Sequence, residues 1–478
     1  MNLFQKMAFV LGPLCWCGTA IFDSNFEQPE LIQMLGIATW MMLWWISEVV
    51  PIFVTALLPM LLFPTSGLFS IKETFAPYAH PIIFLFMGGF IIALAMEKRK
   101  LHLRIALNLI KLTGTKPTGI ILGFSLATAF LSMWISNTAT TVMMLPIALS
   151  VLHLLSQNDN QFEYKKFGLA LMLSIAYSAN IGGTMTLIGT PPNVVLAGFI
   201  ENRYGIEIGF GQWMLIGVPF GLIMLSLSYV VLTKSIIQIK LPNVKGASEL
   251  ISTELKKLGR MQFAEKGVLI IFIVTALLWM FKSQVNQIVF QDSILSNTTI
   301  AMFGGILLFC IPVNLSKKEF LLDWQAMKDL PWGILLLFGG GLSLAGGLET
   351  VGAIELVGTF AAENLNTSVW VIVLGLAAIS LFATEIMSNV ALVTVLLPVV
   401  LGISDQMGIP AFELAIPVTL AASCAFMMPI STPPNAVVYS SGQIKVKQMM
   451  RVGFVLNVAT ILVLSAVMYW LIQRLFVG

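Results

Sequence analysis

The stretch Trp134-Ile135-Ser136-Asn137-Thr138-Ala139-Thr140 lies in the middle of an apolar segment, residues 118–155, that contains no Asp, Glu, Lys or Arg. Three adjacent polar side chains in such a segment are not expected to face lipid, because a polar group in hydrocarbon without a hydrogen-bond partner is costly. The stretch is therefore predicted to lie inside the protein, where it interrupts a membrane-embedded helix.

A second copy of this stretch occurs 252 positions later, as Ile386-Met387-Ser388-Asn389-Val390-Ala391-Leu392. Each copy is followed by a Leu-Pro pair whose proline lies ten residues after its serine, at Pro146 and Pro398. Each is later followed by Thr-Pro-Pro-Asn, at residues 190–193 and 432–435. Phe86-Met87-Gly88-Gly89 and Phe338-Gly339-Gly340-Gly341 match at the same spacing of 252. We interpret these pairs as an internal repeat, with one binding site assembled from both copies.

The composition is that of an integral membrane protein. Of the 478 residues, 58% are hydrophobic and only 10% are charged, and the mean hydropathy is +0.91. A net charge of +3 is too small to indicate a nucleic-acid partner. The three histidines are widely spaced and the four cysteines form no CxxC pair, so neither residue type predicts a metal cluster. The sequence also lacks an HExxH motif and a nucleophile with an evident base, which argues against a membrane enzyme.

The hydropathy pattern predicts an all-α polytopic membrane protein with about eleven transmembrane helices. The two stretches that hold the Ser-Asn motifs, 117–155 and 367–404, have arms of about 18 residues each. Each stretch is either a re-entrant hairpin with the motif at its tip or a pair of full spans, and counting residues does not separate the two. The predicted spans are 7–22, 31–46, 49–64, 78–97, 166–200, 211–233, 266–281, 297–313, 331–349, 411–443 and 452–474.

The distribution of Lys and Arg predicts the orientation, because loops rich in these residues remain in the cytoplasm. The basic loops are 98–116, 165–166, 234–266, 317–328 and 445–451, whereas 23–30 is acidic and carries no Lys or Arg. The N-terminus is therefore predicted to be cytoplasmic and the C-terminus external. No Lys or Arg lies between Lys328 and Lys445, so the second motif hairpin is expected to open outward and the first inward. Inverted repeats with broken helices are typical of secondary transporters.

The residue types of the motifs suit both an anion and a cation. Ser, Asn and Thr at a helix start place hydroxyl and amide groups beside unpaired backbone N–H groups, and the positive end of the helix dipole favours an anion. Two such tips can hold the two ends of a small dianion. In Thr-Pro-Pro-Asn, the prolines interrupt the helix and leave upstream carbonyls without partners. Those oxygens suit a hard cation such as Na⁺, and Gly189 allows close approach of the backbone.

Two other polar groups have a structural alternative. Ser296-Asn297-Thr298 follows a polar run, and we interpret it as a helix cap at the membrane surface. Glu385 precedes the second motif, and an acidic residue near the membrane interior indicates either a functional group or a structural partner of the hairpin.

At the two Ser-Asn motifs and the two Thr-Pro-Pro-Asn motifs, the chain resembles the divalent anion–sodium symporter family over nearly its whole length. The family transports dicarboxylates, citrate or sulfate. The resemblance implies eleven spans, two re-entrant hairpins, a homodimer in the bilayer and an elevator-type movement of a transport domain against a scaffold domain. The chain departs from the family at Val390, where many members carry a second Thr.

The resemblance also implies which residues form the sites. One Na⁺ site would use Ser132, Ser136, Asn137 and Gly189, and the other would use Thr384, Asn389 and the backbone near Met387 and Ser431. The substrate would contact Ser136, Asn137, Thr138, Ser388, Asn389, Val390, Thr432 and Pro433. Two or more sodium ions are expected, and no organic cofactor.

The domain organisation follows the same division. Residues 1–116 are assigned to scaffold spans 1–4 and an interfacial helix, 117–200 to the first transport-domain hairpin and broken helix, and 201–366 to spans 6–9 with a cytoplasmic linker at 234–266. Residues 367–445 are assigned to the second hairpin and broken helix, and 446–478 to the last span.

The leading functional hypothesis is sodium-coupled symport of C4 dicarboxylates such as succinate, malate or fumarate across the cytoplasmic membrane. A citrate or sulfate symporter, or a dicarboxylate exchanger, on the same scaffold is the alternative within the class. A channel is a further alternative, although doubled sites at inverted breaks favour alternating access.

Overall fold

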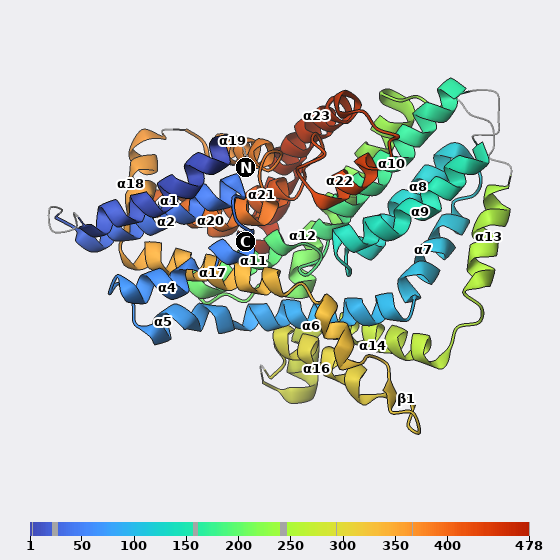
Figure 1. Ribbon diagram of the computed structural model, residues 1–478, viewed down its shortest axis with the longest axis horizontal. Coiled ribbons are helices and arrows are strands. Elements are labelled where there is room, and N and C mark those ends of the chain that lie inside the picture. Colours follow the sequence, from blue (N-terminus) through green and yellow to red (C-terminus); the bar gives the residue numbers. More distant parts are fainter. Residues whose placement is uncertain are drawn as a thin grey trace.

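The computed structural model describes residues 1, 3–21, 27–155, 161–239, 246–292, 294–365 and 367–477, and most of them are helical (Figure 1). Eight helices among these residues are long and apolar enough to cross a membrane. These candidate spans are Ile71–Lys98, Asn137–Leu154, Glu163–Thr184, Phe210–Ser235, Phe263–Met280, Trp332–Thr350, Asn389–Met407 and Val446–Phe476. The prediction of a polytopic helical membrane protein is confirmed at this level.

The N-terminal quarter consists of apolar helices followed by the amphipathic helix that the sequence predicts to lie at the interface. Its helices are α1 (Leu3–Ile21), α2 (Pro29–Ser47), α3 (Ile52–Thr55), α4 (Leu58–Thr65), α5 (Ile71–Phe75), α6 (Pro81–Lys98) and α7 (Leu101–Leu112). The predicted span 49–64 is divided between α3 and α4. Helix α7 is the predicted interfacial helix, and an ion pair between Arg104 and Glu265, with a nitrogen–oxygen distance of 2.5 Å, ties it to α14 (Phe263–Met280).

The first repeat is a helical hairpin followed by an interrupted helix. The hairpin arms α8 (Pro117–Ser132) and α9 (Asn137–Leu155) lie side by side, and α10 (Gln161–Thr184) packs against both (Figure 1). The predicted span 166–200 is not continuous, because the helix stops at Thr184 and resumes as α11 (Pro191–Tyr204). Arm α8 has 16 residues and is about 24 Å long at 1.5 Å per residue, short of a hydrocarbon core of about 30 Å. Arm α9 has 19 residues and contains the candidate span Asn137–Leu154, so the arm lengths are compatible with both a re-entrant hairpin and two full spans.

The middle of the chain joins the two repeats and contains the only strands among the described residues. Its helices include α12 (Phe210–Val230), α13 (Ala247–Lys257), α14, α15 (Lys282–Val285), α16 (Asn297–Cys310), α17 (Trp332–Thr350) and α18 (Ala353–Asn364). Strands β1 (Pro312–Asn314) and β2 (Glu319–Phe320) form a short antiparallel pair. The sequence predicts no strand here, since it extends the preceding span to residue 313. Ser296 caps α16 by accepting from Thr299 N at 3.1 Å, as predicted.

The second repeat reproduces the first. Arms α19 (Val369–Ala383) and α20 (Asn389–Met407) are followed by α21 (Ala411–Ala422), a break, and α22 (Pro433–Tyr439). The predicted span 411–443 is therefore interrupted at residues 423–432. Helix α23 (Val446–Leu462) continues through the π-helical segment Val463–Met468, the short α24 (Tyr469–Ile472) and a second π-helical segment, Gln473–Val477.

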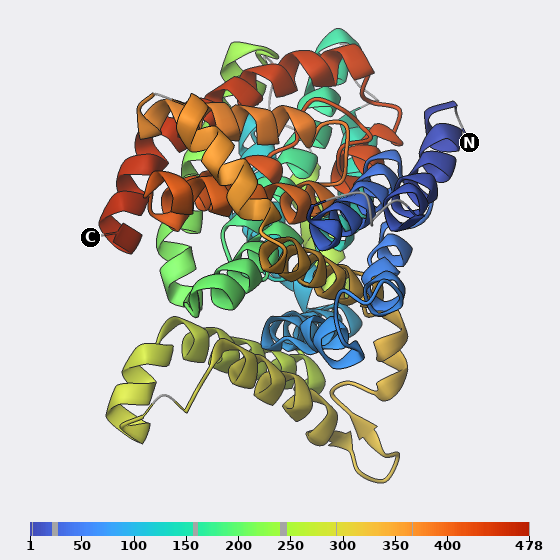
Figure 2. The same ribbon diagram turned by 90° about the vertical axis from the view of Figure 1, so that its left-hand side faces the viewer.

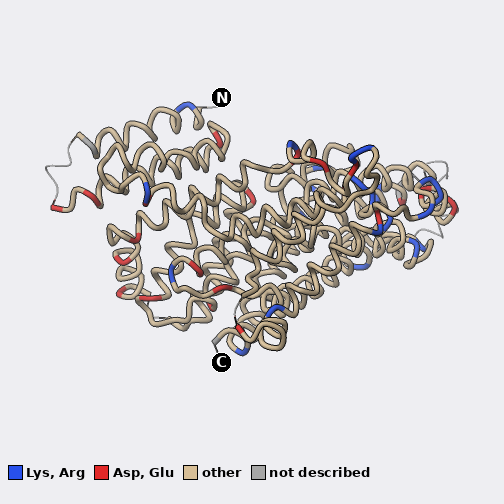
Figure 3. The backbone as a smooth tube through the Cα atoms, turned by 90° about the horizontal axis from the view of Figure 1, so that it is seen from below, with Lys and Arg blue, Asp and Glu red and all other residues tan. Residues whose placement is uncertain are grey.

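The two repeats are interlocked in a single body. Helix α22 of the second repeat packs against α9 and α10 of the first, and α11 of the first repeat packs against α20 and α21 of the second. Figure 2 shows α14 and α16 at the lower edge of the molecule and the repeats at the upper edge, with α6 between them. In Figure 3, most Lys and Arg residues gather toward the right-hand end of the long axis.

Candidate functional site

The Ser-Asn motifs lie where the hairpins turn into their second arms. Ser136 precedes α9 and its Oγ accepts from Ala139 N at 3.2 Å, so it caps the helix. Ser388 occupies the N-cap position of α20, without a side-chain capping bond. Both second arms therefore begin at the motif asparagine, Asn137 or Asn389. The first-turn N–H groups of these helices are the donors that the sequence predicts for an anion.

The Thr-Pro-Pro-Asn motifs restart the two interrupted helices. Prolines 191 and 433 occupy the first helical position, where the missing N–H is not needed and the fixed φ suits the helix. Thr432 accepts from Asn435 N at 3.4 Å and caps α22, whereas Thr190 makes no such side-chain bond. The two helix starts after the breaks, which we call restarts, therefore share the same proline at the first helical position. They differ in that only the Thr432 hydroxyl caps its helix.

The two repeats build the same cluster of oxygen atoms. In the first, Ser132 Oγ lies 2.5 Å from Asn137 Oδ1 and 2.8 Å from Ala179 O. In the second, Thr384 Oγ1 lies 2.7 Å from both Asn389 Oδ1 and Ala422 O. A hydroxyl has one proton and cannot donate to both neighbours, so each cluster has more acceptor oxygen than its own donor satisfies. Neutral oxygens in this arrangement fit a hard monovalent cation such as Na⁺.

Two glycines allow the first cluster to form. A Cβ at Gly183 would lie 2.6 Å from Asn137 Oδ1, and a Cβ at Gly189 would lie 2.5 Å from Gly183 O. Backbone and side chain therefore meet at a spacing that no other residue permits. Gly189 was predicted from sequence for this reason, whereas Gly183 was not.

The carbonyls released by the helix breaks have a partner that the sequence analysis did not assign. Asn193 Nδ2 donates to Gly183 O at 3.2 Å and to Thr186 O at 2.8 Å. Asn435 Nδ2 donates to Ala425 O at 3.1 Å and to Met428 O at 3.0 Å. The last residue of each motif therefore holds two carbonyls of its break, and each of these oxygens keeps a second lone pair. The carbonyls at the oxygen clusters lie further upstream, at Ala179 and Ala422.

Both tips and both restarts line one cavity of about 800 Å³. All the predicted substrate contacts line it: Ser136, Asn137, Thr138, Ser388, Asn389, Val390, Thr432 and Pro433. Of the predicted cation ligands, Gly189, Met387 and Ser431 line it as well. Ser132 and Thr384 do not, and lie behind the two asparagines to which they are hydrogen bonded. The cavity extends to Gln5, Ser47 and Glu48, near the start of α1 and the end of α2, which the sequence analysis did not select.

Glu385 is a structural partner in this arrangement. The residue is 4% exposed. Oε1 accepts from Phe426 N at 2.8 Å and Met427 N at 2.9 Å, and Oε2 accepts from Met428 N at 3.1 Å. Asn457 Nδ2 on α23 donates to Oε1 at 2.8 Å. Of the two alternatives left by the sequence, the structure supports the one in which Glu385 organises the loop 423–432.

Comparison with known proteins identifies relatives along the whole chain. Residues 25–476 match the family described as the sodium:sulfate symporter transmembrane region. A sodium-dependent dicarboxylate transporter, SdcS, of Staphylococcus saprophyticus is 40% identical over 477 residues, which cover 98% of this chain and 92% of that protein. The protein of the same name from Staphylococcus aureus strain RF122 is 39% identical over 472 residues, covering 98% and 91%.

Two solved structures share the fold at low sequence identity. MtrF of Neisseria gonorrhoeae, described among antimetabolite efflux pumps, aligns with a TM-score of 0.58 and 12% identity, over 86% of this chain and 84% of its own. The YdaH transporter of Alcanivorax borkumensis aligns with a TM-score of 0.58 and 12% identity, over 84% and 86%. These likenesses concern the fold alone.

Proposed function

The chain belongs to the sodium:sulfate symporter family, and from that premise we propose that it couples sodium entry to the uptake of C4 dicarboxylates such as succinate, malate and fumarate. The relatives named as sodium-dependent dicarboxylate transporters support the coupling ion and the substrate class. The observation that carries the proposal is the convergence of both Ser-Asn tips and both Thr-Pro-Pro-Asn restarts on one cavity.

The cavity has the groups that a small dianion requires. The starts of α9 and α20 bring unpaired N–H groups and the positive ends of two helix dipoles. Thr138 offers a hydroxyl at the first tip, and Val390 stands at the equivalent position of the second. A carboxylate at each tip would use the two ends of the cavity, which suits a substrate with two carboxylates a few bonds apart.

The oxygen clusters support two sodium sites, one in each repeat. Asn137 and Asn389 each belong to a cluster and also line the cavity, so one amide side chain can respond to both ions. Sodium at a cluster would satisfy the asparagine Oδ1 and fix the side chain beside the substrate. This shared residue is the physical basis that we propose for coupling.

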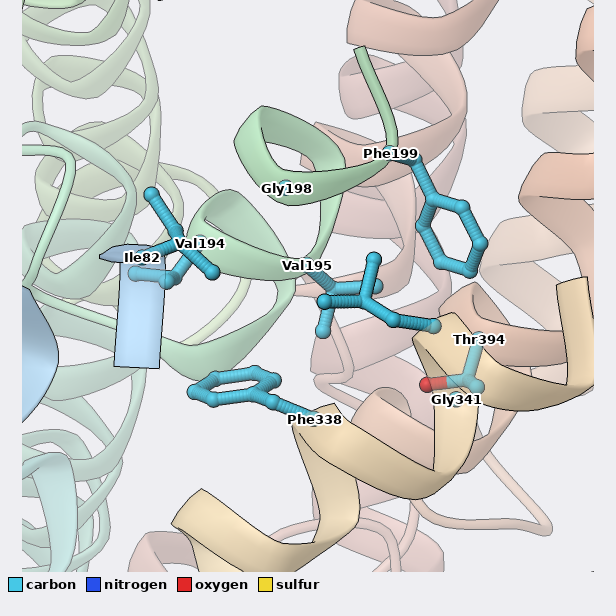
Figure 4. A pocket seen from close by; sticks show the side chains of 9 residues that line it. Ile82, Val194, Val195, Gly198, Phe199, Phe338, Gly341 and Thr394 are labelled. Carbon is cyan, nitrogen blue, oxygen red and sulfur yellow. The ribbon is translucent and has the colours of Figure 1, made fainter. Parts of the chain in front are cut away.

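We propose that the two interlocked repeats move together against α6 and α17 as an elevator. Figure 4 shows Val194, Val195 and Phe199 of α11 beside Phe338 of α17 and Thr394 of α20. This contact encloses only about 10 Å³ of space and is almost wholly apolar. Thr394 Oγ1 donates to Val390 O at 2.8 Å within its own helix, so it presents no unpaired hydroxyl there. An apolar contact without directional bonds permits sliding at low cost.

The proposal includes a direction. The predicted orientation puts the start of α1 and the end of α2 in the cytoplasm, and the cavity reaches Gln5 and Glu48 at those ends. The conformation is then inward-facing. We also propose the homodimer that the family resemblance implies, and native mass spectrometry in detergent at about twice the chain mass of 52.2 kDa tests it.

Uptake of labelled succinate into proteoliposomes tests the function. We expect accumulation with an inward sodium gradient, none when potassium replaces sodium, and competition by malate and fumarate. Uptake that needs internal dicarboxylate instead of a sodium gradient would identify an exchanger. Inhibition by sulfate or citrate in place of C4 dicarboxylates would identify the alternative symporter. Uptake that needs neither a sodium gradient nor internal dicarboxylate would refute both symport and exchange.

A further inference from the structure

Asn180 on α10 joins the first repeat to the site of the second. It is 1% exposed and lines the cavity. Its Nδ2 donates to Thr432 Oγ1 at 3.2 Å and to Ala425 O at 3.1 Å. Both amide hydrogens are therefore used on the loop that precedes α22. The sequence analysis did not select Asn180, because it lies in a helix and outside both motifs.

The Thr432 hydroxyl can act toward the cavity only as a hydrogen-bond donor. Its oxygen accepts from Asn180 Nδ2 at 3.2 Å and from Asn435 N at 3.4 Å. A hydroxyl has two acceptor lone pairs and one proton, so these bonds occupy the acceptor side. Among the described residues, no hydrogen bond uses the Thr432 proton, and Thr432 lines the cavity. The proton is therefore available to a ligand in the cavity, and the hydroxyl is a donor there.

The first repeat has no counterpart to this arrangement among the described residues. Thr190, the equivalent of Thr432, makes no side-chain capping bond. The two Thr-Pro-Pro-Asn motifs are 242 residues apart, and the cluster carbonyls of Ala179 and Ala422 are 243 apart. At these spacings Asn180 corresponds to Ala422 or Ser423, and Ser423 Oγ donates to Thr419 O in its own helix at 3.2 Å.

We propose that Asn180 is a positioning residue that holds the Thr432 hydroxyl as an obligatory donor to one carboxylate of the substrate. The inference rests on the proposed function, because it assigns the ligand at Thr432 to a carboxylate. It makes the two Thr-Pro-Pro-Asn segments unequal, because Asn180 holds the Thr432 hydroxyl whereas Thr190 makes no side-chain capping bond.

A double-mutant cycle on succinate affinity tests this assignment. The variants are Asn180→Ala, Thr432→Val and the pair, measured in proteoliposomes at saturating sodium. Each single change should raise the KM for succinate about tenfold, since a hydrogen bond to a charged group is lost or misdirected. The pair should be no worse than Thr432→Val alone. The maximal rate and the sodium concentration for half-maximal uptake should stay within about twofold, because the oxygen clusters are unchanged.

Two further variants separate positioning from packing. Thr432→Ser keeps the hydroxyl, so Asn180→Ala should again raise the KM about tenfold in that background. Ser178→Ala is the matched control, because Ser178 is equally buried on α10 and its Oγ makes no hydrogen bond within the described residues. Ser178→Ala should leave the KM unchanged.

The results that would overturn the role of Asn180 differ from those that would refute the proposed function. Equal effects of Asn180→Ala in the wild-type protein and in the Thr432→Val variant would overturn the inference. So would an unchanged KM in Asn180→Ala. If that variant is poorly folded, Asn180→Ser, whose hydroxyl can bond to its own helix, replaces it in the same cycle. Wild-type protein without sodium-driven succinate uptake would refute the proposed function itself, before any variant is compared.

Discussion

Replacing Glu385 by Gln tests whether one buried carboxylate holds the second half of the site together. The change keeps the shape of the side chain and exchanges one acceptor oxygen for an NH₂ donor. Three backbone N–H groups, of Phe426, Met427 and Met428, and the amide of Asn457 point at this carboxylate. With the nitrogen at the Oε2 position, the Met428 N–H would face another donor and lose its partner.

The magnitude follows from these four contacts. An unsatisfied buried donor costs about 1–3 kcal/mol, and bonds to a charged acceptor exceed neutral ones by about 1 kcal/mol each. The lost bond and the three weakened ones together give about 4–6 kcal/mol, close to the roughly 3–5 kcal/mol expected for removing one partner from a buried charged pair. The loss falls on residues 423–432, which carry Ser431 and Thr432. We therefore expect Glu385→Gln to abolish sodium-driven uptake.

The assay combines uptake with thermal unfolding of the purified protein, with and without sodium. Glu385→Gln should insert in the membrane but lose the sodium-dependent increase in Tm. Glu413→Gln is the matched control, because Glu413 is 5% exposed on α21 and lies outside the loop 423–432. Wild-type uptake together with a wild-type sodium shift in Glu385→Gln would refute the role assigned to the carboxylate.

Three further predictions concern the tips and the topology. Asn137→Ala and Asn389→Ala should each abolish uptake with normal expression, since each removes an oxygen ligand and a cavity contact; near-normal uptake in either variant would place the site elsewhere. Val390→Thr should keep transport and lower the KM for succinate, and Thr138→Val should raise it, each by at most roughly tenfold to a hundredfold for one hydrogen bond to a charged group; unchanged affinity in both would assign this position to packing. In a cysteine-free background, a single cysteine at the exposed Gln406 should react with an impermeant maleimide from outside, and one in the linker helix α13 from inside; labelling of both from one side would contradict the inverted repeat.

Local patterns determine much of this protein. Hydropathy identifies a membrane protein because each apolar run has to satisfy its own backbone inside lipid. The spacing of 252 between Ser136 and Ser388 identifies the repeat without any structure. The residues predicted to contact substrate line one cavity. Polar groups in an apolar membrane segment avoid lipid, where they would have no hydrogen-bond partner. The break of each long span follows from Thr-Pro-Pro-Asn, although its position upstream of the motif does not.

Tertiary packing decides which groups are free and which are occupied. The sequence around Asn193 and Asn435 does not indicate that their side-chain amides donate to backbone carbonyls at the helix breaks. From the sequence alone, Glu385 can be a functional or a structural group. The fold places Phe426 N within hydrogen-bond distance of its carboxylate, which identifies the structural role. Asn180 reaches Thr432, 252 residues away in the chain, because the two repeats interlock. A hydrogen bond depends on where both partners lie, and for partners on different repeats that position is set only when the helices pack.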